Sequence, residues 1–160
     1  MIFLDFETAK VPVSFTRPDT GEKMSRRWRV IAAGIGLDDG SVVIVDDEDE
    51  LELLAKVGEF MKPGERVLYC ATREFDEMIA KGRFTNARRA HLPEACFPAV
   101  PGAEDVEWVN IRKSQELSER KPSADDLPSK DVPEAWKRGE RDRVIRHLVA
   151  DVEWLMENRP

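Results

Sequence analysis

The sequence contains no apolar run that approaches the roughly 20 residues of a membrane-spanning helix. Its first residues also lack the basic region, long apolar stretch and cleavage site of a signal peptide. Cysteine is scarce: Cys70 and Cys96 stand alone without the spacing of a metal site, which is typical of free thiols in a reducing compartment. We therefore expect a cytoplasmic globular protein with no membrane partner, and its 160 residues are most simply one domain, 1–160.

Positive charge is also in deficit, because 25 Lys and Arg face 32 Asp and Glu, for a formal net charge of −7. This balance argues against a non-specific coat on nucleic acid but leaves room for a local basic groove. Basic residues gather in three clusters, at residues 26–29, 83–89 and 137–146. They are candidates for phosphate contacts, and Trp28 is a candidate for stacking on a base. A solvated surface explains any one cluster equally well.

The hydrophobic pattern predicts a mixed α/β fold, with an Asp-Asp-Gly turn at residues 38–40 as its strongest hairpin signal. The predicted strands cover residues 2–6, 30–37, 42–45, 67–70 and 106–111, the last of them at a sheet edge. The predicted helices cover residues 51–61, 74–81 and 142–157. Residues 10–29 predict a long loop or irregular hairpin, whereas residues 84–101 and 114–140 predict loops with short helical pieces. Gly34 and Gly36 lack the third glycine of a dinucleotide-binding motif, so that class of site is excluded.

Two acids interrupt the first strand, which is otherwise apolar enough to be covered on both faces. Because side chains alternate along a strand, Asp5 and Glu7 point to the same face. Two like charges beside an apolar layer are unfavourable unless something compensates them. Either these acids lie in water just beyond the strand, or a cation lies between them.

The last helix carries a histidine and an acid four residues apart, His147 and Asp151. On a helical wheel Asp151 falls at one border of the apolar stripe, with His147 on the same side, which favours a cleft over open solvent. That stripe is predicted to contain Val144, Ile145, Leu148, Val149, Val152, Leu155 and Met156. An exposed histidine–aspartate pair is the alternative.

A further acid, Asp76, begins the helix that follows the strand at residues 67–70, where open α/β sheets place active-site residues. An ordinary acid in the first turn of a helix is the alternative. Together with Asp5, Glu7 and Asp151 it makes four carboxylates, whose oxygens suit two Mg²⁺ or Mn²⁺ ions. Two such ions activate a water and stabilise the leaving oxygen in phosphodiester hydrolysis.

These motifs resemble those of the DEDD-type 3′–5′ exonucleases of the ribonuclease H-like superfamily, which includes proofreading exonucleases and ribonucleases T and D. The first motif, Asp-x-Glu-Thr, is matched by Asp5-Phe6-Glu7-Thr8. The second, Asn-x-x-x-Phe-Asp, corresponds to Thr-Arg-Glu-Phe-Asp at residues 72–76, with Thr72 at the place of the asparagine. The third, a Tyr or His shortly before an Asp, is matched by His147 and Asp151, with the four-residue spacing of the tyrosine subgroup.

The resemblance implies a ribonuclease H-like mixed sheet flanked by helices, and an enzyme that acts on single-stranded DNA or RNA. It implies that Asp5 bridges two metal ions, which would be Mg²⁺ or Mn²⁺. Glu7 and Asp151 would complete the site of one ion, and Asp76 would serve the other. His147 would be the general base. Residues implied to hold the terminal nucleotide are Phe6, Thr8, Thr72 and Phe75.

Three functions are consistent with the sequence: an active two-metal exonuclease, an inactive relative that binds nucleic acid or a protein, and a different ribonuclease H-like enzyme such as a structure-selective endonuclease. The third fits least well, because the Asp-x-Glu-Thr motif and the histidine-to-aspartate helix follow the exonuclease pattern. The presence of all four acids favours the first over the second, because a protein released from catalysis gains nothing from acids clustered at a cleft.

Overall fold

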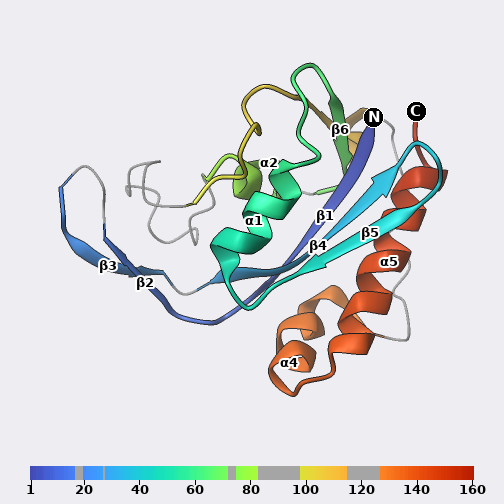
Figure 1. Cartoon of the computed structure of the whole chain (residues 1–160). Helices are drawn as coiled ribbons and strands as arrows, with labels where there is room; N and C mark the ends of the chain where they lie inside the picture. Colours follow the sequence, from blue (N-terminus) through green and yellow to red (C-terminus); the bar gives the residue numbers. More distant parts are fainter. Residues whose placement is uncertain (17–19, 27, 72–74, 83–97, 115–126) are drawn as a thin grey trace.

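The computed structural model describes residues 1–16, 20–26, 28–71, 75–82, 98–114 and 127–160. These residues form a five-stranded sheet with helices on both faces, and a separate two-stranded ribbon (Figure 1). The sheet contains β1 (Ile2–Ala9), β4 (Arg29–Leu37), β5 (Val42–Asp46), β6 (Arg66–Tyr69) and β7 (Glu107–Asn110), and the ribbon contains β2 (Val13–Thr16) and β3 (Lys23–Arg26). The helices are α1 (Glu50–Gly58), α2 (Phe75–Ala80), α3 (Ile111–Ser114), α4 (Val132–Lys137) and α5 (Arg141–Glu157), with a 3₁₀ turn at Ser129–Asp131.

The strand that carries the Asp-x-Glu-Thr motif, β1, lies at the centre of a sheet with the order β5-β4-β1-β6-β7. It is antiparallel to β4, and β4 is antiparallel to β5, which confirms the predicted hairpin around residues 38–40. On its other side β1 is parallel to β6, and β6 is parallel to β7. Parallel neighbours need crossover connections, and the chain passes through α1 before β6 and through α2 before β7. The predicted α/β class with a mixed sheet is therefore confirmed.

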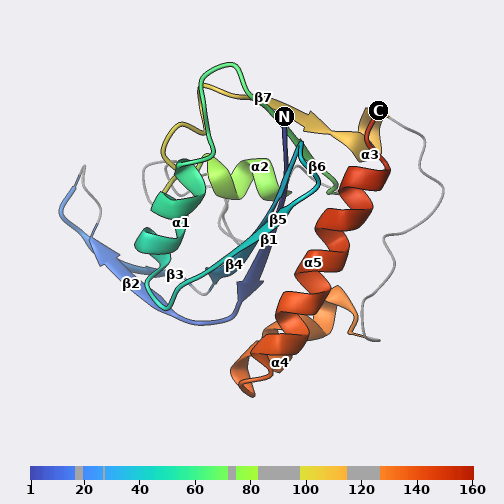
Figure 2. The same ribbon diagram turned by 45° about the vertical axis from the view of Figure 1, so that its right-hand side comes forward.

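The two faces of the sheet bury alternate residues of β1, every one of which is buried. Leu4 and Phe6 pack in a core with apolar residues of α1 and α2. Phe3 points the other way and packs with Val152 and Leu155 of α5. Figure 2 shows α1 and α2 on one side of the sheet and α4 and α5 on the other. Asp5 and Glu7 share the face of Phe3 because side chains alternate, so they lie under α5.

Two glycines of β4, Gly34 and Gly36, allow α5 to lie close to the sheet. A Cβ atom at Gly34 would come within 2.7 Å of the Val152 Cγ2 atom, and one at Gly36 would come within 2.6 Å of the Met156 sulfur. Gly34 is the residue of β4 that lies opposite Asp5. The absence of side chains here therefore determines how near α5 comes to the acids of β1.

Several segments differ from the sequence-based expectation. Residues 10–29 include a regular antiparallel ribbon, in which Val13 pairs with Arg26. The predicted edge strand ends one residue early, because the buried Ile111 begins α3. Residues 127–140 contain short helical pieces, as predicted, and α4 packs Val132 and Ala135 into a core beside Ala9. Most of the segment 84–101, namely residues 84–97, lies outside the described residues.

Among the described residues, no helix is long and apolar enough to cross a membrane. Cys96 lies outside the described residues, so the expectation that both cysteines are free thiols stays a prediction.

Candidate metal centre

Helix α5 turns its histidine and its second aspartate inward. His147 is 1% exposed and Asp151 is 3% exposed. The sequence analysis put Asp151 at the border of the apolar stripe of this helix. Three apolar residues predicted to lie within that stripe are only half-buried, namely Ile145, Val149 and Met156. The buried face of α5 is thus rotated toward the polar pair, because the opposing strand offers Asp5 and Glu7 instead of apolar side chains. The prediction that this pair faces the protein interior, and not open solvent, is confirmed.

Three side chains from the two ends of the chain meet in this space: Glu7 of β1, and His147 and Asp151 of α5. Each offers one ligand atom, and the three atoms lie within 4.8 Å of one another. The Nε2 atom of His147 is 3.3 Å from Oε1 of Glu7 and 3.5 Å from Oδ2 of Asp151. A buried group of this composition can hold a metal ion.

The hydrogen bonding of the His147 ring indicates whether the group suits a cation. Within the described part of the chain, neither ring nitrogen of His147 has a hydrogen-bond partner of normal geometry. A buried polar atom without a hydrogen bond costs about 1–3 kcal/mol. A cation between the imidazole and the two carboxylates would remove that cost for Nε2, the nitrogen that faces the acids, so the residues fit a metal ion.

Burial and mutual repulsion perturb the titration of this group. The pKa of Glu7 is raised to about 7, mainly by burial; the contact with His147 opposes the shift, and the charge of Asp5 adds to it. Burial alone would lower the pKa of His147, but Glu7, Asp151 and Asp5 outweigh it, so that the pKa is raised. The protein without metal therefore holds protons here near neutral pH, and a divalent cation would take their place.

The remaining two acids of the predicted site lie outside the group of three. Asp5 is 6% exposed and lies near enough to shift the pKa values of both Glu7 and His147. Asp76 is 2% exposed at the start of α2, and its Oδ1 accepts a hydrogen bond of 2.9 Å from the Phe6 backbone N–H. In β1 only Ile2 and Phe3 pair with β6. Asp76 therefore accepts the hydrogen bond of a β1 backbone N–H group that lies beyond this pairing.

The four predicted nucleotide contacts are placed differently from one another. Phe6 is 3% exposed and packs in the core between β1 and α1, so the structure gives its side chain a packing role. Phe75 is half-buried and packs against the same core. Thr8, which follows Glu7 in the chain, lines a small pocket. Thr72 lies outside the described residues. Contact with a nucleotide stays a prediction for all four.

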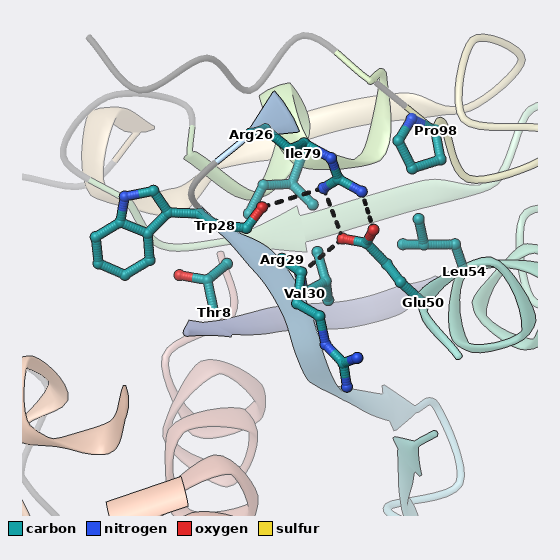
Figure 3. Close-up of a pocket in the computed structure, with 9 residues that line it drawn as sticks. All are labelled: Thr8, Arg26, Trp28, Arg29, Val30, Glu50, Leu54, Ile79 and Pro98. Carbon is teal, nitrogen blue, oxygen red and sulfur yellow. Dashed lines mark hydrogen bonds and ion pairs between the residues drawn. The ribbon is translucent and has the colours of Figure 1, made fainter. Parts of the chain in front are cut away.

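The pocket beside Thr8 is closed on one side by a buried ion pair between Arg26 at the end of the ribbon and Glu50 at the start of α1 (Figure 3). Arg26 Nη1 donates to Glu50 Oε1 at 2.8 Å, and the Val30 backbone N–H donates to the same oxygen at 2.8 Å. Glu50 is 8% exposed. This bidentate contact holds the ribbon against the body of the protein.

The predicted basic clusters are largely compensated by acids. Besides Arg26, the pairs are Arg141 with Glu48, Arg143 with Glu140, and Lys137 with Glu134. Trp28 lies 5.3 Å from the ammonium of Lys10, which reaches over its ring. The cluster at residues 83–89 lies outside the described residues. Phosphate binding by these clusters stays a prediction.

Three residues that build this region were not predicted from the sequence. Gly34 and Gly36 were interpreted only as parts of a nucleotide motif, although glycine inside a strand is itself a signal of close backbone approach. Glu50 is one of several acids before α1, and nothing in its local sequence marks it as the buried one.

No family model and no curated protein matches the chain. Among solved structures, the family B DNA polymerase from the hyperthermophilic archaeon Pyrobaculum calidifontis contains a similar fold, with a TM-score of 0.56 and 14% sequence identity. The match covers 97% of this chain and 23% of the polymerase, so this chain spans about a quarter of that protein's length. At this identity the likeness shows a shared fold and nothing more.

Proposed function

We propose that this protein is a metal-dependent 3′–5′ exonuclease that hydrolyses the phosphodiester bond at the 3′ end of single-stranded DNA or RNA. The observation that carries the proposal is the meeting of Glu7 with His147 and Asp151. These residues belong to the first and third motifs that resemble the DEDD exonucleases, and their ligand atoms lie within 4.8 Å of one another although about 140 positions separate them in the chain.

The fold supports the same proposal. The mixed sheet, with the motif strand at its centre and helices on both faces, is compatible with the ribonuclease H-like fold that the motif resemblance implies. The similar structure is a DNA polymerase, and the motifs resemble a family that includes proofreading exonucleases. The proposed nucleic-acid substrate rests on the motif resemblance, and the shared fold is compatible with it.

Each acid has a role in the proposed reaction. Two bound Mg²⁺ or Mn²⁺ ions would supply the attacking hydroxide and would stabilise the leaving 3′ oxygen. Asp5 would contribute to both ion sites, Glu7 and Asp151 would complete one, and Asp76 would serve the other, partly through waters. His147 is the candidate that the resemblance offers for accepting the proton of the attacking water.

Thr8 directly follows Glu7 in the chain, which places it beside the acids for a binding role. It lines a small pocket together with Arg26, Trp28 and Ile79. An indole and a threonine hydroxyl are suited to stack on a base and to bond a terminal sugar. Thr8 would thus hold the 3′-terminal nucleotide so that its phosphodiester bond reaches the acids.

The direct test is to incubate the purified chain with Mg²⁺ or Mn²⁺ and a 5′-labelled single strand, as matched DNA and RNA. An exonuclease gives a ladder that shortens from the 3′ end, and it leaves a circular single strand intact. Asp151→Asn should lower the rate by on the order of 100-fold or more, whereas Glu153→Gln, an exposed acid on the same helix, should leave it unchanged.

The other two candidate functions predict different results. Cleavage of the circular strand would show an endonuclease. Failure of the folded protein to cut either strand with any of the metals would refute the proposal. Binding of the labelled strand by fluorescence anisotropy would in that case identify an inactive nucleic-acid-binding domain.

A further inference from the structure

The side chain of His147 lies inside the acidic group. It is 1% exposed, and its Nε2 atom lies between the carboxylates of Glu7 and Asp151. Both N–O distances, 3.3 and 3.5 Å, exceed the 2.7–3.2 Å of an ordinary N–H···O hydrogen bond. The ring is therefore aimed at the acids without bonding well to either one.

These separations match those of ligands that share one ion. With metal–ligand distances of roughly 2.0–2.2 Å, two neighbouring ligands lie about 3.0 Å apart around an octahedral ion and about 3.4 Å apart around a tetrahedral one. The Nε2 atom of His147 lies at such distances from Glu7 and from Asp151. The three ligand atoms lie within 4.8 Å of one another, so a cation among them would draw the carboxylates of Glu7 and Asp151 together.

The donor set indicates which ions bind. Mg²⁺ and Ca²⁺ prefer oxygen ligands, whereas imidazole nitrogen favours the first-row transition metals, whose affinity for such sites rises from Mn²⁺ to Cu²⁺ and falls again at Zn²⁺. Resting on the proposed function, we propose that Nε2 of His147 is a direct ligand, with Glu7 and Asp151, of a divalent transition-metal ion. The site therefore discriminates against Mg²⁺.

This assignment changes the role of the histidine. The electron pair of a ring nitrogen that binds a cation is not available to accept the proton of the attacking water. His147 would therefore position the metal instead of acting as the general base. Substitution of His147 then changes metal affinity and metal preference, and not only the rate of a proton transfer.

The test uses Mn²⁺, whose electron spin reports nitrogen ligands directly. The full chain is freed of metal with a chelator, loaded with Mn²⁺ and examined by electron spin echo modulation. We expect a ¹⁴N modulation from a bound imidazole, and its replacement by a ¹⁵N pattern when the histidines carry ¹⁵N. The chain contains two histidines, so His91→Gln serves as the matched control and should keep the signal, whereas His147→Gln should abolish it.

Calorimetry of the same samples gives the metal preference. His147→Gln should weaken Mn²⁺ binding by about ten-fold or more and should change Mg²⁺ binding much less. Manganese bound by the wild type without nitrogen modulation would overturn the ligand assignment, and cleavage of nucleic acid by that same sample would leave the proposed function standing. Nitrogen modulation in a protein that cuts no strand would uphold the assignment and refute the exonuclease. The isotope experiment needs no variant, so a failure of His147→Gln to fold does not prevent the test.

Discussion

Glu7 should make the metal-free protein less stable as the pH rises from about 4.5 to 7. The folded protein holds a proton on this carboxyl up to a pKa of about 7, against an ordinary value of 4.5. A raised pKa in an acid means that the folded state binds more protons than the unfolded state between these values, so the free energy of unfolding falls with increasing pH. Each tenfold difference in proton affinity between the two states corresponds to about 1.36 kcal/mol, so the loss is about 3 kcal/mol.

Four other groups with shifted pKa values affect stability outside this interval. The lowered pKa values of Asp39, Asp47 and Glu140 affect stability only below their ordinary values near 4. The raised pKa of the Met1 amino group affects stability only above pH 8. The pKa of His147 is also raised, so its contribution is present at low pH and is lost as the pH rises, in the same direction as that of Glu7.

The measurement is urea unfolding at half-unit steps from pH 5 to 7.5 in the presence of a chelator. Glu7→Gln should largely flatten the curve, because it removes the titrating carboxyl and the main contact that raises the pKa of His147. Glu52→Gln, an exposed acid of α1, should keep the full slope. A wild-type stability that is level or increases between pH 5 and 7.5 would refute the reasoning. Mn²⁺ at 100 times its dissociation constant should restore about 2.7 kcal/mol at pH 7.5.

Two further predictions concern residues that position the acids. Asp76→Ala should lower the free energy of unfolding by about 1–3 kcal/mol, because it leaves the Phe6 N–H without its acceptor. Asp76→Asn should keep most of the stability and lose nuclease activity. Equal stability losses of the two variants in urea unfolding would contradict this. Gly34→Ala should also lower the free energy of unfolding by about 1–3 kcal/mol and should weaken Mn²⁺ binding, because its Cβ atom would meet Val152. Adding Val152→Ala should restore part of both. A double-mutant cycle with no coupling would count against close packing as the cause.

Local patterns of the sequence were sufficient for most elements of the fold. The apolar run from Ile2, the turn at residues 38–40 and the periodicity of residues 142–157 each lie within one element, and each appears in the structure with shifts of a few residues. Where β2 and β3 form, the sequence predicts only a loop or irregular hairpin, because these strands have four residues each and carry few apolar side chains. Strand order depends on contacts between distant segments, which no local pattern reports.

The candidate site was predictable in composition but not in geometry. Asp5, Glu7 and Asp151 follow from motif spacing, yet the depth of His147 depends on how α5 is rotated against β1. The helical wheel was drawn from apolar side chains alone. It therefore put Asp151 at the border of the buried face instead of within it. The hydrogen bond from Phe6 to Asp76 was equally hidden, because it exists only where β6 stops pairing with β1.

The two sides of the metal group come from distant parts of the chain, Glu7 from the first strand and His147 with Asp151 from the last helix. During synthesis the ribosome releases the acids of β1 before α5, which packs on Gly34 and Gly36. Binding of a metal ion to all three residues would therefore have to follow the synthesis of α5. A product cut by a protease before residue 147 would keep the whole Asp-x-Glu-Thr motif and would lack the site.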